Sequence, residues 1–470
     1  MPKKYHINIK ETPPRFHPVG KFATVEFREE CAGSCSECVK KKCIYDIFEQ
    51  NYLHMSNMEE PQYLYTCESC FRCVQECTRG IFSRVINPEY AALGDEYWTP
   101  DIVHQTWVQA QTGRVPVSGA GYGGRFTGPG FDAMWTDMSE IVRPTRDGIH
   151  GREYINTSIE LSRRSGRLEI APNGSISAGS VPILEVPLPL LFSQPEFGLL
   201  GRNVLLTMVA AAQELGTLMF IQPEDFQADM DPYIRNLVAR LDRNNLDIHT
   251  HLVQNCRMLE LADEANISET IGRAKAINPD IFVSVGLALD KNAPRRALEL
   301  AGMQNIDSLH FYADSAGNET DASRPRFISE MIREIQLGLV EARLRFRINL
   351  LFSGGIALAE HLAKAVICGA DGVTIDRPLL LALECRMCFR CLKSGQCPVK
   401  MADVRLKWGR QRILNLVGAW RNQLIEVMGA MGIREARRLS GEIGRSMWFE
   451  ELEKESFGPL FGQRKAGGLG

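Results

Sequence analysis

The stretch RINLLFSGGIALAEHLAKAVICGADGVTIDRPLLLALECRMCFRCLKSGQCPV, residues 347–399, carries the clearest structural pattern in the chain. An apolar run at 348–352 leads into a serine and two glycines at 353–355, and a segment with helical spacing separates them from a second apolar run at 372–376. This order predicts strand, turn, helix and strand. Glycines that end a strand and open a helix let backbone N–H groups approach a phosphate, so we expect a phosphate-bearing cofactor at this turn.

A group of four cysteines closes the stretch, with the spacing C-x2-C-x2-C-x5-C. It consists of Cys385, Cys388, Cys391 and Cys397. The chain has 14 cysteines, and twelve of them fall into three such groups. Clustered thiols in a long chain favour metal over disulfides, so we expect a metal cluster within electron-transfer reach of the cofactor. The two remaining residues, Cys256 and Cys368, are expected to be small buried apolar side chains.

Two further cysteine groups lie near the amino terminus. They are Cys31, Cys35, Cys38 and Cys43, and then Cys67, Cys70, Cys73 and Cys77. The second has the C-x2-C-x2-C-x3-C run of bacterial ferredoxins, in which three thiolates hold one cluster and the fourth reaches the other. The pattern predicts two [4Fe–4S] clusters, one held by Cys31, Cys35, Cys38 and Cys77 and the other by Cys67, Cys70, Cys73 and Cys43. The first group is one residue longer at two spacings, and Thr78 stands where proline is usual. A pair of four-thiolate zinc sites is the alternative, although zinc prefers two separated C-x2-C pairs.

Strand and helix signals alternate through the second half of the chain. Strands are predicted at 186–192, 217–221, 248–252, 281–285, 308–312, 348–352 and 373–375, and helices at 200–215, 232–241, 295–303 and 327–344. Alternation of this kind predicts parallel βα units. Seven strands with one more unseen would close a (β/α)8 barrel, and a doubly wound open sheet is the second choice. The barrel is preferred because barrels commonly bind phosphate after their seventh and eighth strands.

Composition limits the class of protein. Hydrophobic residues make up 44% and charged residues 24% of the 470 residues, which is typical of globular proteins. The net charge of −3 gives no electrostatic argument for nucleic acid or an anionic membrane. The first residues do not lead into the apolar run of a signal peptide, and no apolar stretch is long enough to span a bilayer, so we expect a cytoplasmic protein.

The expected domains follow from these patterns. They are an arm at 1–24, a 2[4Fe–4S] ferredoxin-like domain at 25–90, an irregular connector at 91–180, the barrel at 181–400 and a helical extension at 401–470. The extension has an apolar stripe that is typical of a packing face. Its basic residues, such as Arg405, Lys407, Arg410 and Arg412, are expected on the solvated side.

Residues from about 150 to 440 resemble the FMN-binding synthase domain of glutamate synthase, in its archaeal-type form. The match is closest at 352–356, 364–372, 380–385 and 395–399. The resemblance implies an FMN-type barrel with an adjacent iron–sulfur cluster. Cys385, Cys391 and Cys397 match the three ligands of the [3Fe–4S] cluster in the bacterial enzyme, and Cys388 would be a fourth. Four ligands favour [4Fe–4S], with [3Fe–4S] kept open.

The resemblance also implies a set of FMN-binding residues. They are Ser193, Gln194, Ser353, Gly354, Gly355, Gly372 and Arg377. Other family features are replaced, because Ser284 stands where a lysine is expected and the glycine-rich loop is reduced to residues 313–317. Glutamate formation needs donors for the two carboxylates of 2-oxoglutarate, and these cannot be assigned from the sequence, so the catalytic residues stay unknown.

Two functions follow as hypotheses. The first is a glutamate synthase-like oxidoreductase in which ferredoxin-type clusters pass electrons to FMN, with glutamate formed from 2-oxoglutarate and ammonia. The resemblance alone implies that product. The second is an electron-transfer or scaffold subunit of a larger redox complex. Expected partners are a redox partner subunit, a ferredoxin or an NAD(P)H-oxidising protein, and a separate ammonia-supplying subunit.

Overall fold

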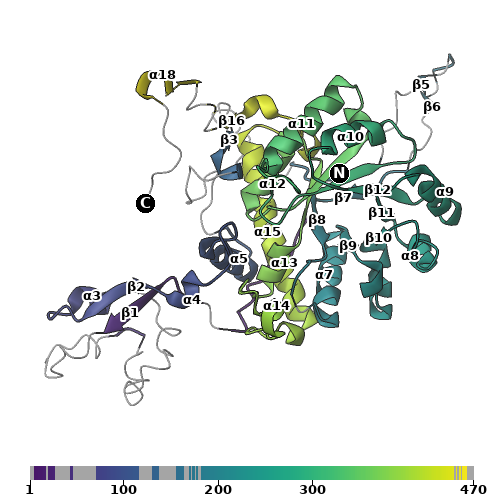
Figure 1. Ribbon diagram of the computed structural model, residues 1–470. Coiled ribbons are helices and arrows are strands. Elements are labelled where there is room, and N and C mark those ends of the chain that lie inside the picture. Colours follow the sequence, from purple (N-terminus) through teal and green to yellow (C-terminus); the bar gives the residue numbers. More distant parts are fainter. Residues whose placement is uncertain are drawn as a thin grey trace.

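The computed structural model describes most of the chain outside its cysteine-rich and glycine-rich amino-terminal stretches (Figure 1). The described residues are 5–16, 19–26, 43–45, 70–115, 130–136, 155–162, 169–170, 172–174, 176–177, 182–198, 200–448, 451, 455–456 and 458–462. Eight of the twelve grouped cysteines fall within these ranges. Cys31, Cys35, Cys38 and Cys67 lie outside the described residues, as does much of the predicted ferredoxin-like domain.

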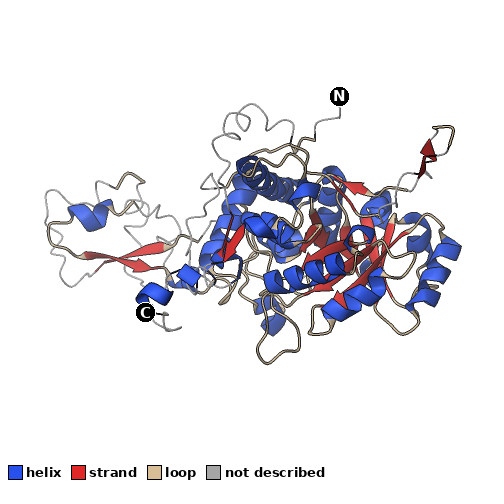
Figure 2. Ribbon diagram, turned by 90° about the horizontal axis from the view of Figure 1, so that it is seen from above, coloured by secondary structure: helices blue, strands red, loops and turns tan. Residues whose placement is uncertain are grey.

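Eight parallel strands form a closed barrel (Figure 2). In chain order they are β8 (Leu190–Ser193), β9 (Met219–Ile221), β10 (Leu237–Leu241), β11 (Met258–Ala262), β12 (Phe282–Ala288), β13 (Ser308–Tyr312), β14 (Asn349–Ser353) and β15 (Gly372–Ile375). The last strand pairs with the first, with Val373 opposite Leu190. The predicted (β/α)8 barrel is confirmed, and the open sheet is excluded.

Helices cover the outside of the barrel (Figure 1). They are α7 (Arg202–Leu215), α8 (Thr250–Asn255), α9 (Ile267–Ile277), α10 (Ala293–Ala301), α11 (Ile328–Glu341), α12 (Ala359–Cys368) and α13 (Arg377–Ala382). Each presents an apolar face to the strands, and α7 and α12 are buried along most of their length. Between β9 and β10 a 3-10 segment, Ala228–Asn236, takes the place of a regular helix.

Two assignments between residues 228 and 262 were wrong. The predicted helix 232–241 is the end of the 3-10 segment followed by β10, and the predicted strand 248–252 is a turn that leads into α8. Strand β11 went unrecognised. Strands buried on both faces are continuously apolar, so they lack the alternation that separates a strand from a helix.

The amino-terminal part forms a small sheet apart from the barrel (Figure 1). Strand β1 (Phe22–Glu26) pairs with β2 (Phe82–Ile86) in antiparallel fashion, and the short helix α3 (Arg72–Glu76) lies beside them. Ile81 and Phe82 pack with Cys73, Val74 and Cys77 in a core separate from that of the barrel. The described part of this unit therefore packs two of the predicted cluster ligands, Cys73 and Cys77, against a core of its own.

The predicted connector contains regular structure. Short helix α4 (Pro88–Ala91) is followed by α5 (Pro100–Thr112), which begins at a Thr99 cap and ends at Gly113 in the left-handed region, with φ of 69°. The segment also holds the short strand β3 (Met134–Thr136). Helix α5 packs against α13 and the long helix α15 (Leu406–Ala430). The connector is thus part of the main body of the molecule.

The carboxyl-terminal extension is helical, as predicted. Helix α15 packs on α5, α7 and α12, and the short helix α16 (Ala436–Leu439) follows it. Strand β16 (Ser446–Trp448) pairs with β3, and α18 (Gly458–Phe461) lies near the end. The solvated position predicted for Arg412 is wrong, because its side chain is 1% exposed. Within the described residues, every helix is too short or too polar to cross a membrane.

Candidate functional site

The serine and two glycines after β14 form a turn with free backbone donors. The N–H groups of Gly354, Gly355 and Ile356 have no hydrogen-bond acceptor among the described residues. Gly355 and Ile356 are buried in the barrel mouth. Backbone N–H groups are rarely left unpaired, and consecutive ones make an anion-binding concavity. The turn fits a phosphate group.

Side chains larger than hydrogen do not fit this turn. A Cβ on Gly354 would lie 2.4 Å from the Asp314 carbonyl oxygen, and one on Gly355 would lie 2.4 Å from the Gly317 Cα. Both glycines have positive φ, 96° and 67°. The glycines are required both for backbone conformation and for the close approach of the loop after β13.

The chain between α4 and α5 secures these two loops. The Tyr97 hydroxyl donates to the Gly355 carbonyl at 2.6 Å, and the Trp98 indole donates to the Ser315 carbonyl at 2.8 Å. The amino-terminal segment therefore holds the turn in place from outside the barrel. Sequence reasoning missed this contact because the partners are more than 200 residues apart.

Arg377 follows β15, the strand that pairs with β14 and therefore lies beside the glycine turn. Its guanidinium is 5.1 Å from the centre of the Phe197 ring and 5.8 Å from that of Trp98, and it is 3.8 Å from an Asp95 carboxylate oxygen. Burial raises the pKa of Asp376, with Arg377 opposing the shift. The Arg377 guanidinium is the cation that this end of the barrel offers to an anion.

The other predicted cofactor residues are placed differently. Ser193 ends β8 and accepts a hydrogen bond from Arg240 at 2.7 Å. The Gln194 side chain bonds Asp225 at 2.6 Å and the Gln222 N–H at 3.0 Å. Gly372 begins β15, where a Cβ would meet Ile159, Leu351 and Leu191 at 3.1 to 3.3 Å. The structure does not bring Gly372 to the turn, and its packing explains the glycine without a cofactor.

A buried polar network occupies the centre of the barrel mouth. Glu260 on β11 is 4% exposed and lies 2.6 Å from Nδ1 of His310, which is fully buried on β13. The Tyr312 hydroxyl donates to the same carboxylate, and the Arg240 Nε lies 3.2 Å from it. Sequence reasoning missed all four residues, although a charged residue inside each of two apolar strands was a usable signal.

The network continues across the barrel. His310 Nε2 lies 2.5 Å from the Ser353 hydroxyl, and the Thr374 hydroxyl donates to Ser353 at 2.6 Å. Hydrogen bonds thus join β15, β14, β13 and β11 in one line. Ser353 was predicted to bind the cofactor because it precedes the two glycines. In the structure its hydroxyl is part of this line of hydrogen bonds.

Charges in the network are balanced. Burial opposes ionisation of Glu260, but His310, Arg240 and the Tyr312 hydroxyl hold its pKa below the ordinary value. Burial lowers the pKa of His310 and raises that of Tyr312 well above its usual value, so both are neutral at pH 7. Within this network, the Arg240 guanidinium and the Glu260 carboxylate therefore form an ion pair.

Strand β12 leaves space for this pair. A Cβ on Gly286 would lie 3.2 Å from the Glu260 carboxyl and 3.3 Å from the Tyr312 ring. Ser284, where the resemblance leads one to expect lysine, is fully buried, and its hydroxyl has no partner among the described residues. Arg240, two strands away, supplies a cation to the barrel interior in this chain.

The third cysteine group repeats the backbone of the second. Cys388-Phe-Arg-Cys391 has the same sequence as Cys70-Phe-Arg-Cys73. Both phenylalanines are left-handed, with φ of 53° and 57°, and each is followed by a five-residue helix, α14 (Arg390–Ser394) in the third group and α3 in the second. A left-handed phenylalanine is strained, so its occurrence at the same place twice indicates one shared requirement.

The four thiols of the loop lie close enough to influence one another. Cys385 Sγ accepts a hydrogen bond from the Met387 N–H at 3.4 Å. Burial raises the pKa of Cys385 to about 12, and the three neighbouring cysteines add to the rise. In the described part of the chain, no three His, Cys, Asp or Glu side chains converge on a single metal ion. An iron–sulfur cluster binds each thiolate to a different iron, so its ligands stand further apart.

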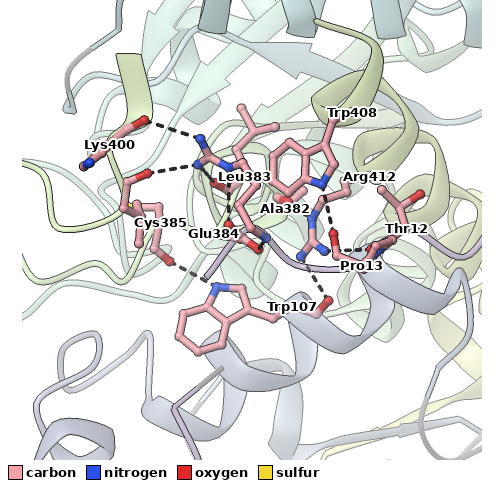
Figure 3. A network of polar contacts seen from close by, with 12 residues as sticks. Thr12, Pro13, Trp107, Ala382, Leu383, Glu384, Cys385, Lys400, Trp408 and Arg412 are labelled. Carbon is pink, nitrogen blue, oxygen red and sulfur yellow. Dashed lines mark hydrogen bonds and ion pairs between the residues drawn. The ribbon is translucent and has the colours of Figure 1, made fainter. Parts of the chain in front are cut away.

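Distant segments fix this cysteine loop (Figure 3). The Trp107 indole on α5 donates to the Cys385 carbonyl at 3.2 Å. The Arg412 guanidinium donates to the carbonyls of Ala382, Thr12 and Trp107 at 2.6 to 3.3 Å. The amino-terminal arm, α5 and α15 therefore meet at the end of α13, where the loop begins.

Fold and site define a (β/α)8-barrel protein with an anion-ready turn, a polar centre and an attached cysteine loop. Residues 249–434 match the model of the family described as "Conserved region in glutamate synthase". The archaeal-type glutamate synthase [NADPH] of Dehalococcoides mccartyi is 21% identical over 90% of this chain and 94% of its own. The archaeal glutamate synthase [NADPH] of Archaeoglobus fulgidus is 22% identical over 92% and 96%.

Among solved structures, a flavocytochrome b2 variant covers 72% of this chain and 94% of its own, at 13% identity and a TM-score of 0.41. This chain is therefore similar to the conserved region of glutamate synthase over residues 249–434, and to archaeal-type glutamate synthases along most of its length.

Proposed function

We propose that this protein is a glutamate synthase-like oxidoreductase that binds FMN in its barrel and receives electrons through iron–sulfur clusters. Two contacts of one side chain carry the proposal. The Phe197 ring lies 5.1 Å from the Arg377 guanidinium and 5.3 Å from the Phe389 ring of the cysteine loop. The anion-ready end of the barrel and the cysteine loop are therefore neighbours, as electron transfer between two bound groups requires.

The residues present fit a flavin phosphate. The free N–H groups of Gly354, Gly355 and Ile356, together with the Arg377 guanidinium, would hold it. FMN exchanges one or two electrons and can supply a hydride, whereas iron–sulfur clusters transfer single electrons. The chain's own part is to bind, orient and exclude water.

For the third cysteine group we propose a [4Fe–4S] cluster on Cys385, Cys388, Cys391 and Cys397, with [3Fe–4S] as the alternative. The shared tetrapeptide and left-handed phenylalanine support the four-ligand form, because Cys388 occupies the place of Cys70 in the ferredoxin-type group. Two further [4Fe–4S] clusters on the amino-terminal cysteines complete the proposal. Their described members are Cys43, Cys70, Cys73 and Cys77, and none of these four forms a disulfide within the described residues.

Glutamate formation from 2-oxoglutarate and ammonia is the proposed reaction, because the relatives are named as glutamate synthases. The second candidate is an electron-transfer or scaffold subunit. Its supporting observation is Gln194, whose side chain is committed to Asp225 and Gln222 and is not free for a flavin. The two candidates differ in whether the protein holds flavin and forms glutamate.

The proposed electron donor is an acidic redox protein. Residues 385–410 contain seven Arg and Lys but one Asp, in a chain of net charge −3. Five of these cations are exposed, and none of the five has an ion-pair partner within the described ranges. They are Arg390, Lys393, Lys400, Arg405 and Lys407. Leu392, 65% exposed, lies among them beside Cys391. A basic surface with an apolar centre suits an acidic protein, which it would attract electrostatically.

Flavin and product analysis test the proposal. Purified under anaerobic conditions, the protein is expected to release about one FMN per chain on acid treatment and to form glutamate from 2-oxoglutarate and ammonium with reduced ferredoxin or viologen. Iron without flavin would refute the enzyme and favour the electron-transfer subunit. Flavin without glutamate formation would retain the flavoprotein and refute the substrate.

A further inference from the structure

We propose that Tyr312 is the proton donor in the barrel, and that Glu260, His310 and Ser353 hold and refill its proton. The inference rests on the proposed function, because it assigns an acid to the imine reduction. Hydride addition to the carbon of an imine leaves charge on nitrogen, and a positioned acid speeds such a step by supplying a proton.

Tyr312 is the phenolic acid of the network and, like Arg240 and Ser353, is only partly buried, so a substrate can reach it. It is the last residue of β13, at the carboxyl end of the strands where barrel chemistry takes place. Its side chain is partly exposed, whereas Glu260 is 4% and His310 0% exposed. Because Glu260 and His310 are buried, they can act on a substrate only through the Tyr312 hydroxyl.

The hydrogen bonds order the proton movement. The Tyr312 oxygen lies 2.9 Å from His310 Nδ1, and His310 Nδ1 lies 2.6 Å from Glu260. When the phenol gives its proton to the imine nitrogen, the Nδ1 proton can move to the phenolate. His310 Nε2 then takes the Ser353 hydroxyl proton, and solvent returns a proton to Ser353, which is partly exposed. One hydride and one solvent proton convert the C=N bond into an amine.

Charges around the phenol favour this assignment. The Arg240 guanidinium lies 4.9 Å from the Tyr312 ring centre and stabilises a phenolate, and Glu260 opposes it. Two other titratable groups face this pair: His310, which is neutral, and Glu196, which interacts with Arg240. Glu260 and Arg240 act as positioning residues, because both lie against the phenol.

Removal of one hydroxyl tests the assignment. Tyr312→Phe is expected to lower kcat by roughly 10² to 10⁴-fold with KM nearly unchanged, since general acids contribute that much. Flavin and iron contents are expected to equal those of the wild type. Tyr233→Phe, outside the barrel on the 3-10 segment, is the matched control and is expected to keep full activity.

Two readouts separate a chemical role from a structural one. Replacing all tyrosines by 3,5-difluorotyrosine acidifies the phenols, so it is expected to move the alkaline limb of the wild-type kcat profile to lower pH and to leave the Tyr312→Phe profile in place. Without turnover, the ¹⁵N spectrum of His310 is expected to show the neutral ring with a proton on Nδ1, and Glu260→Gln is expected to alter it.

The outcomes distinguish the two proposals. A Tyr312→Phe variant with wild-type kcat and pH profile would overturn the proton donor alone and leave the oxidoreductase standing. A wild-type protein that binds flavin but reduces no imine would overturn the proposed function and this assignment with it. A His310 ring that is cationic at pH 7 would contradict the order of proton movement.

Discussion

Single residues decide whether the barrel mouth can hold an anion and an ion pair. Gly354 has a φ of 96° and lies against the Asp314 carbonyl. The Glu260 carboxylate is surrounded by His310, Tyr312 and Arg240. Neither position tolerates a change of size or charge without a measurable effect. Two predictions follow at this scale, one on cofactor retention and one on acid stability.

Gly354→Ala is expected to weaken flavin binding by roughly tenfold or more, because a non-glycine residue at this φ costs about 1–3 kcal/mol and tenfold equals about 1.4 kcal/mol. The measurement is FMN content and Kd, with iron content as an internal check. Gly272→Ala on α9 is the control, since a Cβ there meets nothing within 4 Å. Equal flavin affinity in both variants would refute the phosphate site.

Glu260 makes part of the stability pH-dependent. Its pKa is below the ordinary 4.5 in the folded state, so its contribution is present above pH 4.5 and is lost as the pH falls through the folded pKa. Glu260→Gln is expected to be less stable than wild type at pH 7 and to lose less stability below pH 4.5. Thermal midpoints between pH 3 and 7 measure this, and parallel curves for the two proteins would contradict it.

At the scale of elements, α13 and the loop after it connect the barrel to the cysteine group. Arg377 opens α13 and Cys385 follows its end, and α13 spans about 9 Å along its axis. Helices α5 and α15 secure the far end of α13 through Trp107 and Arg412. The loop conformation thus depends on helices that are far away in the sequence.

Arg412→Met is expected to lower the free energy of unfolding by roughly 3–5 kcal/mol, because it removes the hydrogen bonds that a buried cation donates to three backbone carbonyls. Arg405→Met, one residue before α15 and exposed, is expected to stay within about 0.5 kcal/mol. Urea unfolding measures both. A difference below about 1 kcal/mol between them would contradict the structural role of Arg412.

Cys388→Ser is expected to change the electron paramagnetic resonance signal and the iron content of the third cluster, since it removes a ligand of the four-thiolate form. Cys256→Ala is the control. Burial raises the pKa of this thiol to about 12, and it lies outside the three cysteine groups. An unaltered signal in Cys388→Ser would identify the three-cysteine [3Fe–4S] form.

For the whole molecule, charge is distributed unevenly, and the cations gather around the third cysteine group. The chain is acidic overall, yet residues 385–410 carry six more positive than negative charges. Fields of this kind raise association rates with a partner of opposite charge and weaken as salt screens them. The partner proposal therefore predicts a salt-sensitive rate.

Reduction by an acidic ferredoxin is expected to slow markedly between 50 and 500 mM salt, whereas reduction by dithionite is expected to change little. The double variant Arg390→Glu and Lys393→Glu is expected to slow the ferredoxin reaction further. Arg347→Glu, near the start of β14 at the opposite end of the barrel, is the control and is expected to have no effect. Equal rates in the three proteins would refute the docking surface.

The sequence by itself determined the barrel class, the glycine turn and the cysteine groups. These depend on spacing along the chain, and strand-turn-helix order and ligand intervals are local properties that a sequence displays directly. The same reasoning failed between residues 228 and 262, where strands buried on both faces have no period that separates them from helix.

Only the tertiary structure decided which side chains form the centre of the site. Arg240, Glu260, His310 and Tyr312 come from three strands that are up to 72 residues apart in the numbering, and barrel closure alone brings them into one network. The tertiary structure also packs Gly372 closely against neighbouring apolar side chains, and it buries Arg412 next to the start of the cysteine loop. Spacing reports on neighbours along the chain, whereas charge pairing and burial depend on distances in space, which this fold sets by closing β15 onto β8.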